Sequence, residues 1–258
     1  MTNFLEQYAP LEYQETYDNC GLIIGDANAE IKGVLITLDC IESVIDEAIA
    51  TGCNLIVAHH PIIFSGLKKL NGSNYIERTV IKAIKNDIAI YAIHTNLDNM
   101  HNGVSAKIAE KLGLENCKVL APKSDLINKQ VGSGIIGELK TAVNTEVFLE
   151  SLKVNMQTDC VRHTPIVKQE IKRVAVCGGS GSFLLKNAIA AKADVFITAD
   201  FKYHEFFDAE GKMLLCDIGH YESEKYTIDL FSNILSAKFP KFATIFAGTI
   251  TNPIDYLT

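Results

Sequence analysis

The 258-residue sequence has no long hydrophobic run and no closely paired cysteines. No stretch approaches the roughly 18 consecutive apolar residues of a membrane-spanning helix, so we expect no membrane association. The N-terminal segment MTNFLEQYAPLEY lacks an apolar core, and we do not expect it to be a secretory signal peptide. The seven cysteines are scattered without a CxxC pair, which favours reduced thiols over a disulfide framework. These features together predict a cytoplasmic protein.

Basic residues are in deficit, with 24 Lys and Arg against 31 Asp and Glu and a formal net charge of −7. This balance argues against broad binding to nucleic acid or to anionic membranes. The segment IFSGLKKL (63–70) is the only small basic patch that favours a nucleic-acid-associated regulator, which is a weaker alternative. We therefore expect nucleic acid not to be a partner.

The glycine-rich segment CGGSGS (177–182) lacks the spacing of several well-known motifs. It contains neither the GxGxxG of a dinucleotide fingerprint nor the GK[ST] of a P-loop, and no G-x-S-x-G surrounds its serines. A serine hydrolase is therefore not expected. The segment either cradles an anion with its backbone amides or forms a tight strand–helix turn that needs glycine, and the second interpretation is favoured.

Short apolar strands alternate with helical stretches along the whole chain. Strands are predicted at 32–40, 54–60, 87–94, 133–139, 172–179, 193–200, 212–220 and 242–248. Helices are predicted at 41–52, 75–86, 103–113, 144–156, 182–192 and 223–239. Continuous apolar strands between helices are typical of an α/β protein with a sheet covered on both faces.

The two halves of the chain resemble each other. Residues 34–60 align with residues 174–200, and His59 and His60 then stand opposite Ala199 and Asp200. We interpret the pattern as pseudo-duplicated βαβ units in two similar α/β halves, residues 1–130 and 131–258. Because ligands of open α/β sheets bind beyond the carboxyl ends of strands, we expect a metal site in the cleft between the halves.

Most of the seven histidines follow strand ends. His59, His60, His94 and His220 lie at the carboxyl ends of predicted strands, and His204 comes shortly after another. His101 and His163 fall outside this pattern. A single histidine at a strand end is usually structural, but four or five at equivalent ends favour a shared site.

Two carboxylates accompany these histidines. Asp98 and Glu224 stand four residues after His94 and His220, a spacing that shares one face if the chain is helical there. Imidazole and carboxylate ligands suit Zn, Fe, Mn or Ni, and a bridging carboxylate allows two ions in one centre. The alternative is helix N-capping, because Asp98 precedes a predicted helix and Glu224 opens one.

Several segments together resemble the Nif-three-like family, whose members often carry the name type-2 GTP cyclohydrolase I. The segments are YDNCGLIIGD, AHHPIIF, HTNLD, GGSGS, TADFKYH and GHYESE, in this order over nearly the whole chain. The resemblance implies two divalent metal ions per chain, a dinuclear centre made by His59, His60, Asp98, His220 and Glu224. It also implies a toroidal homohexamer, with His94 and His204 beside the metals in positioning or proton-transfer roles.

Some members of that family carry an extra domain near the position of residues 122–134, which this chain crosses in a few residues. The chain therefore resembles the short form, or a long form whose insert is absent, and we expect a more open site if the insert shapes substrate access. The implied function is a metal-dependent hydrolase acting on a nucleotide or a related phosphorylated or cyclic amide substrate, of the GTP cyclohydrolase type. The alternative is a non-catalytic protein that stores metal or has a regulatory interaction role, because the same ligands serve both.

Overall fold

The computed structural model describes residues 1–123, 130–240, 242 and 244–257. Backbone contacts divide the chain into two compact units. The first unit comprises Met1–Leu97 and Thr227–Pro253, and the second comprises Asp98–Tyr226 and Ile254–Thr258. This division differs from the predicted boundary at residue 130. Strands on either side of that residue pair with each other in the second unit, and the last long helix returns to the first unit.

The first unit contains a five-stranded sheet of order β1-β4-β3-β2-β11. Its strands are β1 (Gly21–Ile24), β2 (Val34–Thr37), β3 (Leu55–Ala58), β4 (Ala89–Ala92) and β11 (Thr244–Phe246). β2, β3 and β4 run parallel, β11 joins β2 in parallel, and β1 is an antiparallel edge strand beside β4. All residues of β2, β3 and β4 are buried, as expected for parallel strands covered on both faces.

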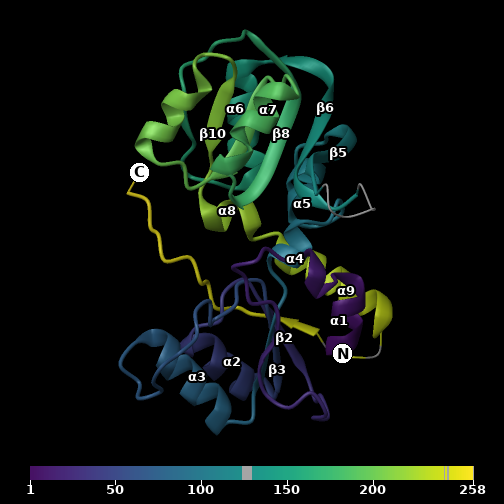
Figure 1. Ribbon diagram of the computed structural model, residues 1–258, viewed down its shortest axis with the longest axis vertical. Helices are drawn as coiled ribbons and strands as arrows, with labels where there is room; N and C mark the ends of the chain where they lie inside the picture. The colour runs from purple at the N-terminus through teal and green to yellow at the C-terminus, as the bar shows by residue number, and fades with distance from the viewer. Residues whose placement is uncertain (124–129, 241, 243, 258) are drawn as a thin grey trace. The chain divides into compact units, whose positions relative to one another are not determined.

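The helices of the first unit follow the pattern of the apolar residues. They are α1 (Thr2–Tyr8), η1 (Leu11–Tyr13), α2 (Glu42–Thr51), α3 (Tyr75–Lys85) and α9 (Thr227–Lys238), and α4 (Thr95–Asp98) spans the boundary between the units. α2 and α3 lie side by side over the sheet (Figure 1), where Val44 and Val80 pack with Ile56 and Ile90 of the strands. α1 lies beside the end of α9, where the ring centroid of Phe4 is 5.4 Å from that of Phe239, the residue that follows α9.

The second unit contains a six-stranded sheet of order β5-β6-β8-β9-β10-β7. Its strands are β5 (Glu115–Pro122), β6 (Gly132–Asn144), β7 (Arg162–His163), β8 (Glu170–Ser180), β9 (Val195–Ala199) and β10 (Leu214–Asp217). β8, β9 and β10 are parallel, and β5, β6 and β7 pair antiparallel with their neighbours. The parallel sets β2-β3-β4 and β8-β9-β10 repeat the same connection, which agrees with two similar α/β halves.

Helices cover both faces of the second sheet. They are α5 (Val104–Lys111), α6 (Thr145–Met156), η2 (Ser182–Leu184), α7 (Leu185–Ala190), η3 (Tyr203–Ala209) and α8 (His220–Glu224). Alternating residues of the strands face opposite sides. Val174 and Val195 pack with Phe148 of α6, whereas Ala175 and Phe196 pack on the side of η2 and α7.

Each of the eight predicted strands overlaps a strand of the structure. The helix predicted at 223–239 is instead two helices. α8 already begins at His220 and ends at Glu224, and α9 begins at Thr227. Elements that were not predicted include β5, β7 and α1. The first of these has an exposed and mostly polar first half, which hides it from a search for apolar runs.

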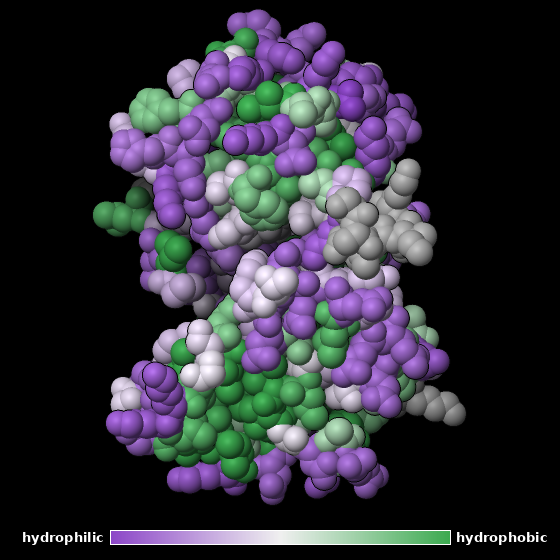
Figure 2. Space-filling view, viewed as in Figure 1, coloured by the Kyte–Doolittle hydropathy of each residue, from purple (hydrophilic) through white to green (hydrophobic). Residues whose placement is uncertain are grey.

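The surface and the thiols bear on the expected environment of the chain. Among the described residues, no helix is long and apolar enough to cross a membrane. All seven cysteines are free, with Cys117 and Cys160 exposed. Figure 2 shows mostly hydrophilic residues on the visible face of the second unit, whereas hydrophobic residues gather on the first unit near α2 and β2. The crossing at 122–134 lies partly outside the described residues.

Candidate metal centre

Three histidines of the first unit converge where β3 and β4 end. His59 and His60 follow β3, and His94 comes two residues after β4. Ring centroids are 4.9 Å apart between His59 and His60, 5.2 Å between His59 and His94, and 5.3 Å between His60 and His94. One ring nitrogen of each lies within 4.8 Å of the others. The parallel pairing of Ala58 with Ala92 brings these strand ends together.

The Nδ1 atoms of His59 and His60 are both engaged in hydrogen bonds. His59 Nδ1 lies 2.9 Å from the carbonyl oxygen of Ile93, and His59 is fully buried. A carbonyl oxygen can only accept, so Nδ1 of His59 carries a proton. His60 Nδ1 lies 2.8 Å from Oδ1 of Asp39. Thr37 of β2 pairs with Ala58 of β3, and Asp39 and His60 each come two residues after these paired residues.

Asp18 holds the third histidine. Nδ1 of His94 lies 2.9 Å from both carboxylate oxygens of Asp18, whose side chain is fully buried. The backbone amide of Thr95 donates to the same carboxylate at 3.0 Å, the thiol of Cys20 donates at 3.1 Å, and the Thr95 hydroxyl also donates. Burial raises the pKa of Asp18, but these donors outweigh it and leave the pKa well below the ordinary value. Asp18 is therefore a carboxylate that orients a neighbouring imidazole.

His220 and Glu224 are the first and last residues of α8 in the second unit. The predicted i,i+4 pairing holds, because His220 Nε2 lies 3.1 Å from Oε2 of Glu224. Nδ1 of His220 lies 2.7 Å from Oδ2 of Asp200, which also accepts from the hydroxyl of Ser180. Burial lowers the pKa of His220, but the two flanking carboxylates raise it to about 11. Asp200 adopts a left-handed backbone with φ of 59°, which Asp tolerates better than most residues.

Asp98 and Glu224 do not cap helices in the way the alternative required. Asp98 ends α4, and the N-cap of the next helix, α5, is Gly103. Glu224 ends α8 instead of opening a helix. The two residues offer carboxylate oxygens within 4.8 Å of each other in the second unit. Burial raises the pKa of the neighbouring Cys177 thiol to about 12, and both carboxylates add to the effect.

The glycine-rich loop packs against α8. The backbone amide of Gly179 donates to the Ser223 hydroxyl at 2.9 Å, and that of Gly178 donates to the Ser105 hydroxyl at 3.3 Å. Gly179 has φ of +61°, and a Cβ atom there would collide with the Glu224 carboxylate. These contacts favour the tight-turn interpretation over anion binding, because hydroxyl groups of the chain already engage both amides.

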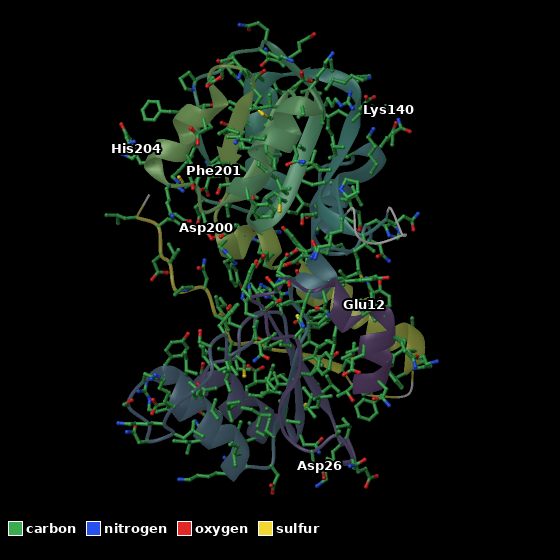
Figure 3. All side chains as sticks on the ribbon, in the orientation of Figure 1. Glu12, Asp26, Lys140, Asp200, Phe201 and His204 are labelled. Atoms are coloured by element: carbon green, nitrogen blue, oxygen red, sulfur yellow. The ribbon has the colours of Figure 1, made fainter. Side chains whose placement is uncertain are left out.

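The remaining predicted residue, His204, lies on η3 and is exposed. Its ring packs with those of Tyr203 and Phe207, at centroid distances of 5.1 and 6.3 Å. Figure 3 shows it at the outer edge of the second unit. Among the described residues, the groups of three candidate metal ligands do not include it. His101 and His163 are also exposed.

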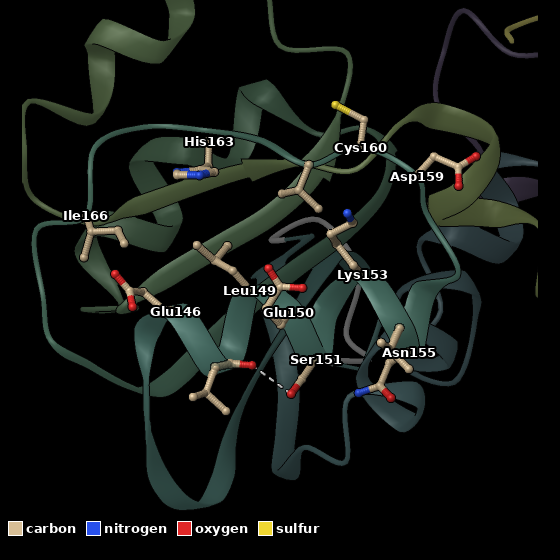
Figure 4. Close-up of a pocket in the computed structure, with 13 residues that line it drawn as sticks. Glu146, Leu149, Glu150, Ser151, Lys153, Asn155, Asp159, Cys160, His163 and Ile166 are labelled. Carbon is tan, nitrogen blue, oxygen red and sulfur yellow. Dashed lines mark hydrogen bonds between the residues drawn. The ribbon is translucent and has the colours of Figure 1, made fainter. Parts of the chain in front are cut away.

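A groove of about 1050 Å³ lies elsewhere in the second unit, between α6 and the segment 159–166 (Figure 4). Glu146, Glu150 and Asp159 line it together with Lys153, and none of the predicted site residues does. The predicted metal ligands therefore lie outside this groove.

The donor set of each unit fits a divalent metal ion. The first unit offers imidazoles, and the second offers an imidazole with two carboxylates, the ligand types that suit Zn and other first-row metals. Each of the four imidazoles places Nδ1 against a carbonyl or carboxylate oxygen, which is the arrangement found behind metal-binding histidines. Asp39 and Asp200 were not predicted as their partners, although each follows a strand beside a histidine-bearing strand.

Comparisons with known proteins agree with the motifs. The family model described as Duf34/NIF3 (NGG1p interacting factor 3) matches residues 1–253. A Clostridium acetobutylicum protein named "GTP cyclohydrolase 1 type 2 homolog" is 31% identical over 242 residues, covering 93% of this chain and 90% of that protein. The crystal structure of Staphylococcus aureus hypothetical protein SA1388 superposes with a TM-score of 0.90 at 30% identity, covering 99% of this chain and 97% of that one.

A longer relative bears on the expected short form. A Staphylococcus epidermidis protein that is also named "GTP cyclohydrolase 1 type 2 homolog" is 27% identical over 358 residues, covering 98% of this chain and 97% of the relative. The alignment is longer than this chain, so that relative contains residues with no counterpart here.

Proposed function

Because the chain belongs to the Duf34/NIF3 family, we propose that it binds two divalent metal ions and uses them as a hydrolase. The proposed ligands are His59, His60, Asp98, His220 and Glu224. The observation that carries the proposal is the shared hydrogen bonding of the imidazole Nδ1 atoms to carbonyl or carboxylate oxygens, which is the arrangement found behind metal-binding histidines.

The chain's own residues supply orientation and proton transfer. Bound metal ions would supply Lewis acidity and lower the pKa of a water molecule. Asp39 and Asp200 hold His60 and His220 by their Nδ1 atoms. The Asp18 carboxylate keeps His94 in the tautomer whose Nε2 can accept a proton, and its charge stabilises the imidazolium that forms. His94 is the proposed proton acceptor, and His204 is proposed as a second proton-transfer residue.

The proposed substrate is a nucleotide or a related phosphorylated or cyclic amide compound. The name "GTP cyclohydrolase 1 type 2 homolog" carried by relatives supports this choice. Ring opening of a guanine nucleotide requires attack of water on an amide-like carbon, which suits an activated water molecule beside a general base.

Metal analysis and an activity screen test the proposal directly. Protein loaded with Zn²⁺, Mn²⁺, Fe²⁺ or Ni²⁺ is assayed against GTP, other nucleotides and phosphoesters. His60→Ala should lose metal and turnover, whereas the exposed His163→Ala should keep both. Turnover that is equal in His60→Ala and the parent protein would contradict a metal-dependent reaction. Full metal binding without turnover on any of these compounds would instead favour the metal-storage or regulatory alternative.

We propose further that the protein forms a homohexamer in the cytoplasm. Exposed apolar side chains of the first unit, among them Ile49 and Ile84, offer surface for association between copies. Light scattering coupled to size-exclusion chromatography gives the mass of the assembly, and a monomer at micromolar concentration would contradict the hexamer.

A further inference from the structure

The C-terminal segment of the first unit, Ala247–Thr251, is held by hydrogen bonds to β2, to α2 and to the loop between them. Its first backbone amide extends the β11–β2 pairing by donating to Ile36 O at 2.9 Å. The Glu47 carboxylate on α2 accepts from the amides of Gly248 and Thr249 at 2.6 and 3.0 Å and from the Thr249 hydroxyl at 2.7 Å. These bonds place the end of the segment beside the loop that follows β2.

The last of these ties reaches the carboxylate that holds His60. Thr251 is buried, and its hydroxyl donates to Oδ2 of Asp39 at 2.7 Å. The other oxygen, Oδ1, accepts from His60 Nδ1 at 2.8 Å. The two bonds together fix the plane of the Asp39 carboxylate, whose side chain is 32% exposed and would otherwise have room to rotate. The orientation of the His60 ring therefore depends on both.

The same hydroxyl–carboxylate–imidazole chain occurs at two other histidines. Asp18 links the Thr95 hydroxyl to His94, and Asp200 links the Ser180 hydroxyl to His220. Thr95 directly follows His94 in the sequence, and Ser180 is the last residue of β8, the strand that pairs with β9. At His60, in contrast, the hydroxyl comes from a residue far away in the sequence, because Thr251 is 212 residues from Asp39.

We infer that Thr251 is a positioning residue for His60, and that the Ala247–Thr251 segment is a strap whose docking on Glu47 and Asp39 completes this ligand. The inference rests on the proposed metal-binding role of His60. Metal binding at His60 is then coupled to the position of the chain's C-terminal segment, because an undocked strap leaves Asp39 held from one side only. Partners that orient a ligating histidine typically contribute 10–100-fold to metal affinity.

The test is a Co²⁺ titration of the full chain, followed by visible d–d absorption, whose intensity reports ligand geometry. Thr251→Val, which removes the hydroxyl and keeps the shape, should weaken Co²⁺ binding by about 10-fold or more and change the spectrum. Thr251→Ser, which restores the hydroxyl, should return both toward the parent values. Thr141→Val, at an exposed position on β6, is the matched control and should have no effect. Thermal unfolding of the metal-free variants shows whether Thr251→Val is folded at the titration temperature.

A second variant covers the case in which Thr251→Val does not fold. Glu47→Ala loosens the other end of the strap without touching Asp39, and it should weaken Co²⁺ binding by a smaller factor. Folded variants that bind Co²⁺ with the parent affinity and spectrum, while His60→Ala does not, would overturn the positioning role and leave the proposed centre intact. Equal Co²⁺ binding by His60→Ala and the parent protein would overturn both.

Discussion

The carboxylate of Asp200 accepts a hydrogen bond from Nδ1 of His220, with the two atoms 2.7 Å apart. The parallel pairing of β9 with β10 accounts for this contact. Thr198 stands opposite Asp217, and the segments that follow the two strands leave the sheet in the same direction. Asp39 and His60 stand in the same relationship beyond β2 and β3. The strand register of each unit thus delivers a carboxylate to a neighbouring imidazole.

We predict that Asp200→Ala weakens metal binding through His220 by about 10- to 100-fold, because the ring loses the partner that orients it. Binding of Zn²⁺ or Co²⁺ in a competition titration with a chelator measures the change. Asp208→Ala, at an exposed position on η3, is the control and should bind as the parent protein does. Parent-like affinity in Asp200→Ala would mean that His220 does not depend on this carboxylate.

Glu224→Ala should lose both metal ions, because we propose that its carboxylate bridges them. Metal content after dialysis, measured by inductively coupled plasma mass spectrometry, distinguishes the outcomes, with the exposed Glu150→Ala as the control. Retention of one fully occupied ion would contradict bridging. The stabilisation that bound metal gives to the folded state should also disappear, so added Zn²⁺ should no longer raise the unfolding temperature.

Gly179→Ala should destabilise the protein more than Gly211→Ala, although the two substitutions have a similar backbone cost. Gly179 and Gly211 both have positive φ, of +61° and +67°, so an alanine costs about 1–2 kcal/mol at either position. At Gly211 an added Cβ meets nothing within 4 Å, whereas at Gly179 it meets the Glu224 carboxylate. Urea unfolding and metal content should therefore show a larger loss of stability, together with loss of metal, only in Gly179→Ala. Equal effects of the two substitutions would show that the close approach to Glu224 is not required.

Asp194 provides a pH-dependent contribution to stability away from the proposed centre. Burial raises its pKa, but the backbone amides of Arg173 and Lys172, at 2.8 and 3.0 Å, and the ammonium group of Lys168 leave the pKa below the ordinary value. A depressed folded-state pKa stabilises the protein above the unfolded pKa of about 3.9, and this stabilisation is lost as the pH falls through the folded value. Asp194→Ala should therefore lower the free energy of unfolding at neutral pH.

The difference in unfolding free energy between Asp194→Ala and the parent protein should shrink below about pH 4. Urea unfolding across a pH series measures it, and the exposed Asp159→Ala provides the control. A difference that stays constant down to pH 2 would show that the charge of Asp194 does not contribute.

The histidines could be located from the sequence because they follow short, continuous apolar runs that become buried parallel strands. β3 and β4 are buried along their whole length, so the first polar residues after them mark the edge of the sheet. The i,i+4 spacing of His220 and Glu224 likewise anticipated a shared helix face. Local periodicity was sufficient for these features.

The supporting carboxylates depend on pairing between strands, which local patterns do not specify. Asp18 meets His94 across 76 residues of sequence, through the antiparallel contact of β1 with β4. Asp39 and Asp200 carried a usable signal, since each follows a strand that neighbours a histidine-bearing strand. Thr251 carried none, because its position depends on how the segment after β11 folds back onto α2.

His204 offers the sharpest test of the proposed proton transfer, because it is exposed and does not belong to the groups of candidate metal ligands found among the described residues. Loss of a general acid–base typically lowers turnover by about 10²–10⁴-fold. We predict that His204→Ala keeps the fold and both metal ions but lowers turnover by this amount on the substrate that the screen identifies. His163→Ala, which removes another exposed histidine of the second unit, should turn over at the parent rate. If His204→Ala also turns over at the parent rate with its metals intact, proton transfer must be assigned to His94 alone.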